Sequence, residues 1–337
     1  MRHANVAIFV PHNGCPNQCS FCNQKSITGQ SGQPDEQDVV SALETALESL
    51  KEKSREAEIA FFGGSFTAIE RGYMLRLLKA AEPYLPRFKG IRISTRPDCI
   101  DEEILKVLEQ YKISAIELGV QSMSDTVLSA NNRGHTALDV YKSCEMIKSR
   151  GISLGLQMMT NLYKSTKEDD FYTAEEFIKI QCDTVRIYPT QVLAGTLLEQ
   201  LYRRNLHTVY TLEESIDECA QLLEMFNESG IKVIRLGLHS GGGVDESRIA
   251  GAYHPAFRQL CESRIILKKI LKELNVKKPQ EGKSEIYKIE ILTAPENVST
   301  VTGQKKSNLS ELLKHGFDAV VKADKNLKNS EFAIRGR

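Results

Sequence analysis

Long apolar segments, a leader-like start and low-complexity tracts are all missing from this chain of 337 residues. No run approaches the roughly 18 consecutive apolar residues that mark a membrane-spanning helix. The first apolar stretch is too short for the core of a signal peptide and runs directly into cysteines. Glycine and proline, at 22 and 10 residues, are in ordinary supply, which excludes collagen-like and disordered classes. We therefore expect a folded cytoplasmic protein with no membrane contact.

An excess of charge is also absent, because 44 basic residues balance 44 acidic ones. The balance conceals an asymmetry along the chain. Residues 1–260 carry 28 Lys and Arg against 34 Asp and Glu, a net charge of −6, whereas residues 261–337 carry 16 against 10, a net charge of +6. A basic segment can bind a polyanion such as RNA. On charge alone, a solvated lysine-rich surface is the simpler interpretation.

Over the first 240 residues, short apolar runs rich in Ile, Val and Phe alternate with segments of helical periodicity. The apolar runs are Val6–Pro11, Ile59–Gly63, Ile91–Thr95, Ala115–Val120, Ile152–Met159, Thr184–Tyr188 and Val233–Leu238. The helical segments are Asp35–Leu50, Tyr73–Ala81, Asp101–Gln110, Ala137–Ser149, Ala174–Ile180 and Leu212–Ser229. Strand–helix alternation indicates βαβ units and a parallel sheet. Six or seven such units predict an α/β fold with a partial or complete (β/α) barrel of the TIM type, whose chemistry lies at the carboxyl ends of the strands.

The pattern changes after Gly241–Gly243, which we interpret as a hinge. Residues 255–275 have helical periodicity, Ser284–Thr293 alternates as an antiparallel strand does, and Ser307–His315 reads as a short helix. We therefore predict two parts: a barrel core of residues 1–240, and a small, basic α/β extension of residues 241–337 with a possible role in substrate binding.

Eight cysteines in a long chain without a signal peptide do not indicate a disulfide framework. Five of them are scattered singly, and we interpret these as small buried hydrophobic residues. They are Cys99, Cys144, Cys182, Cys219 and Cys261.

The other three form the array Cys15-x3-Cys19-x2-Cys22 directly after the first apolar run. Closely spaced thiolates on one loop can hold an iron–sulfur cluster and leave one iron open to another ligand. A structural zinc site normally has a fourth Cys or His ligand, and His12 could supply it. Spacing and position favour the cluster over zinc but leave both open.

The cysteine array, with Phe21 before its last member, resembles the signature of the radical S-adenosylmethionine (SAM) superfamily. Further stretches are similar, in order, to the Elp3 branch, which modifies the wobble uridine of tRNA. These stretches are Phe61–Phe66, Ser94–Asp98, Glu117–Ser122, Arg133–Thr136 and Tyr188–Thr190. Full-length Elp3 proteins also have an acetyltransferase domain, which we do not recognise here, so the expected relationship is to an Elp3-like branch that lacks this domain.

The resemblance implies a [4Fe-4S] cluster on Cys15, Cys19 and Cys22, and SAM bound at its open iron. Reduction of the cluster would cleave SAM to a 5′-deoxyadenosyl radical that abstracts hydrogen from a substrate. By the same resemblance, the residues expected to contact SAM are Phe21, Gly63, Gly64, Ser65, Ser94, Gln121, Arg133 and Gln157. Arg133 in particular could pair with the SAM carboxylate.

For the catalytic residues, the sequence offers only Tyr188 and His135 as candidates. The expected partners are SAM and an electron donor such as ferredoxin or flavodoxin, with tRNA as the candidate substrate. Two other functions stay open. One is radical SAM chemistry on a small molecule such as a porphyrinogen, and the other is a non-catalytic protein with structural zinc or a cluster.

Overall fold

The computed structural model of the chain describes residues 5–11, 18–23, 32–238, 244–277, 286–328 and 331–336. No helix in these ranges is both long and apolar enough to cross a membrane. The chain divides into two compact units, one of residues 1–211 and 225–253, and the other of residues 212–224 and 254–337. The predicted hinge and the boundary between residues 240 and 241 lie outside the described residues, so that boundary stays a prediction.

The first unit is built on one seven-stranded sheet with the strand order β1-β2-β3-β4-β5-β6-β8. Every neighbouring pair of strands is parallel. The strands are β1 (Asn5–Val10), β2 (Glu58–Gly63), β3 (Gly90–Thr95), β4 (Ile113–Gln121), β5 (Ser153–Thr160), β6 (Thr184–Pro189) and β8 (Lys232–Leu236). The sheet curls into a half-barrel, which confirms the prediction of a partial parallel barrel.

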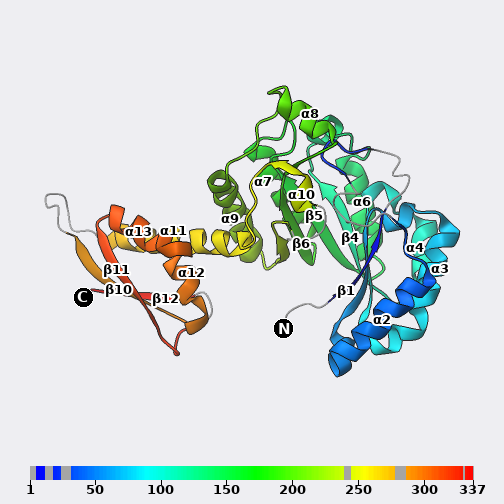
Figure 1. The fold of residues 1–337 in the computed structure, drawn as a ribbon, viewed down its shortest axis with the longest axis horizontal. Coiled ribbons are helices and arrows are strands. Elements are labelled where there is room, and N and C mark those ends of the chain that lie inside the picture. The colour runs from blue at the N-terminus through cyan, green and yellow to red at the C-terminus, as the bar shows by residue number, and fades with distance from the viewer. Residues whose placement is uncertain are drawn as a thin grey trace. The chain divides into compact units, whose positions relative to one another are not determined.

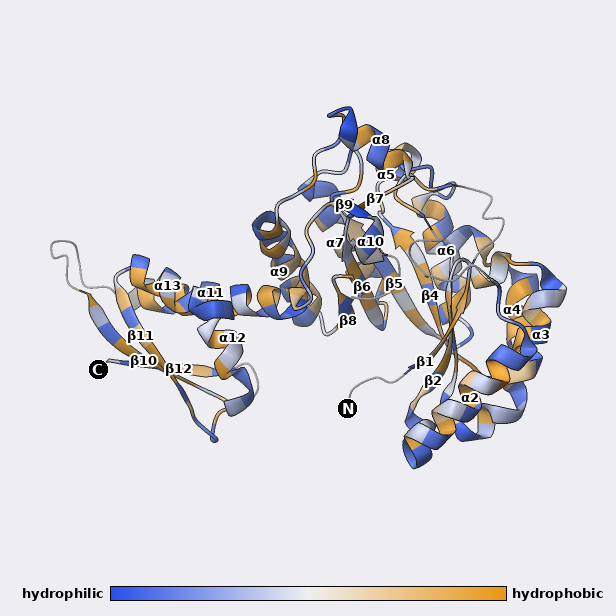
Figure 2. Ribbon diagram, in the orientation of Figure 1, coloured by the Kyte–Doolittle hydropathy of each residue, from blue (hydrophilic) through white to orange (hydrophobic). Residues whose placement is uncertain are grey.

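Helices connect successive strands and lie along the outer side of the sheet, as α2, α3, α4 and α6 do in Figure 1. The helices of the chain up to β8 are α2 (Glu36–Leu50), α3 (Arg71–Ala81), α4 (Glu102–Leu108), α5 (Asp125–Ala130), α6 (Ala137–Lys148), α7 (Lys167–Ile180), α8 (Leu197–Arg203) and α9 (Leu212–Glu228). Most are banded in hydrophobic and hydrophilic colours in Figure 2, as helices with one buried face are. Beyond β8, α10 (Val244–Ser247) precedes β9 (Arg248–Ala250), which pairs antiparallel with β7 (Val192–Leu193).

The two faces of the sheet differ in chemistry. On β6, Val185 and Ile187 are fully buried, whereas Arg186 and Tyr188, which alternate with them along the strand, are half-buried. Because side chains alternate along a strand, one face packs against the helices and the other lines the inside of the half-barrel. We call the second face the inner face. It carries polar and charged side chains, which the apolar runs in the sequence did not lead us to expect.

The second unit contains a three-stranded sheet with the order β11-β10-β12. Its elements are α11 (Phe257–Lys277), β10 (Tyr287–Thr293), α12 (Val298–Thr302), α13 (Ser307–Lys314), β11 (Phe317–Ala323) and β12 (Phe332–Gly336). The strand predicted from the alternation of Ser284–Thr293 is present as β10, but it pairs parallel with β11 and antiparallel with β12. A core around Ile270, Ile291 and Leu312 holds the helices on this sheet.

Candidate functional site

The cysteine segment is fixed at the carboxyl end of the sheet by hydrogen bonds through Ser20. The Ser20 amide donates to the carbonyl of Asn131 at 3.0 Å, and its hydroxyl donates to Oδ1 of the same residue at 2.5 Å. The Leu198 amide donates to the Ser20 carbonyl at 2.7 Å. The Asn131 amide group in turn donates to the carbonyls of Val127 and Tyr163. The segment is therefore anchored to the turn after α5 and to the start of α8.

Two of the three predicted cluster ligands lie in this segment. Cys19 is buried, Cys22 is half-buried, and neither is disulfide-bonded. Cys15 and His12 lie outside the described residues, so the three-cysteine site and its zinc alternative stay predictions. Four of the five scattered cysteines are buried, as the sequence predicts, and only Cys99 is half-buried. Burial raises the pKa of Cys144, Cys182 and Cys261 to about 12, which leaves them as unreactive thiols.

Arg133 joins the cysteine segment to the sheet. Its Nη1 donates to the Cys19 sulfur at 3.2 Å, and its Nη2 donates to the carbonyl of Gly119 near the end of β4. The side chain is 6% exposed. A Cβ on Gly119 would lie 3.2 Å from Gln121 Nε2, which is tight, and at an ordinary 3.6 Å from Arg133 Nη2, so glycine here leaves room for the Gln121 side chain.

The backbone that carries Arg133 is itself held at several points. Its amide donates to the Leu128 carbonyl at 3.0 Å, and its carbonyl accepts from the Arg96 guanidinium. Arg96 is buried and bonds both carboxylate oxygens of Asp98, at 2.9 Å and 2.7 Å. These contacts fix the position of Arg133 over the cysteine segment.

Three buried polar atoms near the carboxyl end of β4 have no hydrogen-bond partner in the described part of the chain. They are Gln121 Oε1, Arg133 Nε and His135 Nδ1. Gln121 also has a φ of +74°, which is strained for a residue with a side chain. Buried polar atoms are normally paired, so these donors and acceptors fit a polar ligand such as an amino acid moiety.

His135 stands beside Arg133 with its ring buried. Its Nε2 lies 3.2 Å from the Val120 carbonyl and therefore carries the proton, because a carbonyl only accepts. Burial lowers the pKa of His135 to about 3, and the charge of Arg133 adds to this. At neutral pH the ring is neutral and offers Nδ1 as an acceptor. Its catalytic role stays a prediction.

The Gly-Gly stretch begins at the last residue of β2, directly beside the end of β1. Gly63 has a φ of +122°, and a Cβ there would lie 2.7 Å from the Val10 carbonyl oxygen. The Gly64 amide donates to the same oxygen at 3.2 Å. Ser65 is buried and precedes a short 3₁₀ turn. Packing of β2 on β1 therefore explains Gly63 without a ligand, and the proposed SAM contacts of these three residues stay predictions.

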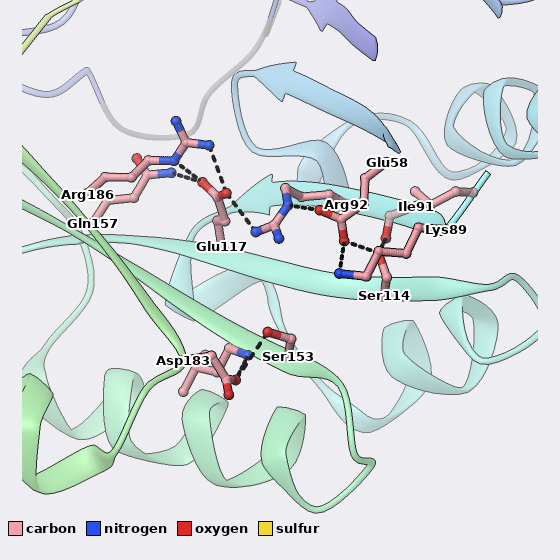
Figure 3. A network of polar contacts seen from close by, with 11 residues as sticks. Glu58, Lys89, Ile91, Arg92, Ser114, Glu117, Ser153, Gln157, Asp183 and Arg186 are labelled. Atoms are coloured by element: carbon pink, nitrogen blue, oxygen red, sulfur yellow. Dashed lines mark hydrogen bonds and ion pairs between the residues drawn. The ribbon is translucent and has the colours of Figure 1, made fainter. Parts of the chain in front are cut away.

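Gln157 belongs to a buried ion network on the inner face (Figure 3). Glu117 is 1% exposed, and it accepts from Arg92 at 2.9 Å, from Arg186 at 2.5 Å and 2.9 Å, and from Gln157 Nε2 at 3.1 Å. Arg92 also bonds Glu58 at 2.8 Å. The network thus links β2 to β6 across the inner face.

The remaining predicted residues lie near this network or in the cysteine segment. Ser94 is half-buried and pairs in register with Glu117 on the neighbouring strand. Tyr188 is half-buried on β6 and interacts with Arg186, whose guanidinium also stacks on Phe62 at 5.2 Å. Phe21 is half-buried between the anchored Ser20 and Cys22.

Sequence reasoning assigned no role to several residues that build the site. They are Arg92, Arg96, Glu117, Asn131 and Arg186. Arg96 and Glu117 lie within stretches that resemble the Elp3 branch, which could have drawn attention to them. Arg92 and Arg186 are charged residues inside apolar runs, and such residues need a partner when buried. Asn131 offers no signal in the sequence.

Comparisons with known proteins show which family the chain resembles. Residues 9–177 match the family model of the radical SAM superfamily, and residues 182–266 match that of the radical SAM C-terminal domain. Elongator complex protein 3 of Schizosaccharomyces pombe is 29% identical over 181 residues, which cover 52% of this chain and 33% of that protein. The tRNA uridine(34) acetyltransferase of Dehalococcoides mccartyi is 25% identical over 241 residues, which cover 61% and 52% respectively. The chain therefore spans a third to a half of the length of these two relatives.

Among solved structures, the archaeal Methanocaldococcus infernus Elp3 with an N-terminal deletion has the same fold. It superposes with a TM-score of 0.61 at 19% identity, covering 82% of this chain and 64% of that one. The superfamily match spans half of the chain and includes the cysteine segment, Arg133 and strands β2 to β5 of the inner-face network, while β6 with Arg186 lies in the C-terminal domain match. The chain therefore belongs to the radical SAM superfamily of enzymes, in its Elp3-like branch.

Proposed function

We propose that this protein binds a [4Fe-4S] cluster through Cys15, Cys19 and Cys22, binds SAM beside it, and modifies a base of tRNA. The observation that carries this proposal is the anchored cysteine segment beside Arg133, together with three buried polar atoms that have no partner among the described residues. When bound, the cluster supplies one electron that cleaves SAM to a 5′-deoxyadenosyl radical able to abstract hydrogen from the substrate.

The residues of the site suit both groups. Iron–sulfur clusters are held by thiolates, and Cys19 and Cys22 lie on one fixed segment without a disulfide bond. SAM presents an amino group and a carboxylate, for which Gln121 Oε1 offers an acceptor and Arg133 Nε a donor. The strained backbone of Gln121 is consistent with a functional position.

The inner face suits a polar substrate. In the ion network, the charges of Glu58 and Glu117 are balanced by those of Arg92 and Arg186. Arg235 on β8, in register with Arg186, adds a further positive charge at the edge of the sheet. A half-barrel wall with surplus positive charge favours an anionic substrate, such as a nucleotide.

Two observations favour tRNA as that substrate. One relative is named for its action on tRNA uridine, although the chain spans only about half of it, so acetyl transfer is not part of the proposal. The basic segment of residues 261–337 could hold RNA phosphates. Action in the cytoplasm and reduction by a ferredoxin or flavodoxin remain parts of the same proposal.

The test is equilibrium binding of total tRNA by the reconstituted protein, followed by fluorescence anisotropy between 50 and 200 mM salt, roughly the range over which phosphate contacts weaken. We expect affinity to fall steeply as salt rises, and tRNA to stimulate the release of 5′-deoxyadenosine from SAM. Absence of binding at low salt, with SAM cleavage intact, would contradict tRNA and leave a radical SAM enzyme of a small molecule.

A further inference from the structure

The contact between Arg133 and the Cys19 sulfur has a consequence for the cluster that the family resemblance does not include. We propose that Arg133 is a positioning residue that donates a hydrogen bond to a cluster ligand and thereby raises the reduction potential of the cluster. The inference rests on the proposed function, since it requires that Cys19 bind iron.

The geometry of the contact supports this role. Arg133 Nη1 lies 3.2 Å from Cys19 Sγ, within hydrogen-bonding distance for a sulfur acceptor. Both residues are 6% exposed, so little water screens the interaction. A guanidinium stays charged at all physiological pH values, which makes this a charge-assisted hydrogen bond.

The position of Arg133 in this contact is fixed by other hydrogen bonds. Arg133 Nη2 donates to the Gly119 carbonyl, and the Arg133 backbone is fixed by Leu128 and Arg96. The sequence suggested that this arginine pairs with the SAM carboxylate. Nη1 and Nη2 each donate one bond, to Cys19 and to Gly119, and Nε has no partner among the described residues. The guanidinium therefore already donates a hydrogen bond to the Cys19 sulfur, whether or not Nε also binds SAM.

The effect on the cluster follows from charge. A one-electron reductant donates an electron to the oxidised cluster, which becomes more negative by one charge, and no bond forms or breaks. A nearby positive donor stabilises the more negative state, and hydrogen bonds to sulfur ligands are a recognised determinant of cluster potential. Arg133 thus makes the cluster easier to reduce.

The experiment compares four proteins: wild type, Arg133→Met, Arg133→Lys and Ser20→Ala. Met keeps the apolar stem and removes the donors, whereas Lys keeps the charge. Ser20→Ala is the matched control, because it loosens the same segment without touching the Cys19 sulfur. Each protein is reconstituted anaerobically, its iron is counted, and its midpoint potential is measured by reductive titration followed by electron paramagnetic resonance, without SAM.

We expect a lower midpoint potential for Arg133→Met, a smaller decrease for Arg133→Lys, and a wild-type value for Ser20→Ala even if its iron content falls. If the Met variant takes up no cluster, the Lys variant decides. A wild-type potential in whichever arginine variant binds a cluster would overturn the inference and leave the proposed function standing. A wild-type protein that binds no cluster would overturn both.

Discussion

At the scale of single residues, Gly63 has a backbone geometry that requires glycine. Its φ of +122° is open almost only to glycine, and an added Cβ would lie 2.7 Å from the Val10 carbonyl oxygen. We predict that Gly63→Ala lowers the free energy of unfolding by about 2 to 4 kcal/mol. Urea unfolding measures this, with Gly151→Ala as the control.

The control separates backbone strain from steric overlap. Gly151 also has a positive φ, of +67°, but nothing lies within 4 Å of a Cβ built there. Its substitution should cost only about 1 kcal/mol. Equal losses in the two variants would show that the approach of β1 does not restrict position 63.

His135 gives the protein a stability that depends on pH. Burial, with the charges of Arg133 and Arg96, lowers its pKa to about 3, while Asp98 acts in the opposite direction. The folded state therefore favours the neutral ring, so this stability is fully present above the unfolded pKa of about 6.5 and is lost as the pH falls toward 3.

We predict that the free energy of unfolding of wild type falls by about 2 kcal/mol more between pH 7 and pH 5 than that of His135→Gln. Glutamine can still donate to the Val120 carbonyl but cannot become charged. Urea unfolding at several pH values gives the comparison. Parallel pH profiles of the two proteins would mean that His135 is not held neutral by the fold.

At the scale of residues, the sequence predicted which residues lie at the site better than it predicted their contacts. Arg133 and Gln121 were selected by resemblance and His135 as an acid–base candidate, and the three residues lie together at the end of β4. The bond from Arg133 to Cys19 could not be predicted, because it joins residues 114 positions apart and depends on how the turn after α5 is held.

At the scale of elements, the inner-face network joins five strands through Glu117. This carboxylate serves two buried arginines, Arg92 and Arg186. Removing one member of a buried ion network leaves the others charged and poorly paired, which costs more than the network contributes when intact. We predict that Glu117→Gln lowers the free energy of unfolding by about 3 to 5 kcal/mol.

An exposed ion pair provides the control for this prediction. Lys314 bonds Glu311 at 2.8 Å on the surface of α13. Glu311→Gln should change stability by less than about 1 kcal/mol, because water already screens the pair. Comparable effects at positions 117 and 311 in chemical denaturation would contradict a buried, coupled network.

The strands were predictable as elements, but the network on them was not. Runs such as Thr184–Tyr188 have enough Ile and Val to predict a buried strand, and β6 forms there. The same run contains Arg186, whose partner Glu117 lies on β4, two strands away from β6 in the sheet. Only the curvature of the half-barrel brings such residues together. The pairing of β10 was predicted only in part: it is antiparallel to β12, as expected, but parallel to β11, since alternation along one strand does not determine the direction of both neighbours.

At the scale of the whole molecule, the basic charge of residues 261–337 is the feature that the proposal assigns to RNA. Lys305 and Lys306 are exposed ahead of α13. We predict that the double change Lys305→Glu, Lys306→Glu weakens tRNA binding and reduces the salt slope of log Kd by about 2. Fluorescence anisotropy measures both quantities.

The matched control changes two exposed lysines outside the basic segment, Lys51 and Lys53, to glutamate. The net charge of the protein shifts by the same amount, so only a local role distinguishes the two variants. Similar losses of affinity in both would indicate general attraction to charge rather than a binding surface in residues 261–337.

The most direct test of the central claim is anaerobic reconstitution with iron and sulfide, followed by reduction with dithionite and addition of SAM. Wild type should take up about four irons per chain, as one [4Fe-4S] cluster requires, and release 5′-deoxyadenosine. Cys19→Ala should release none. A wild type that holds only zinc, or that holds a cluster and leaves SAM intact, would contradict the account.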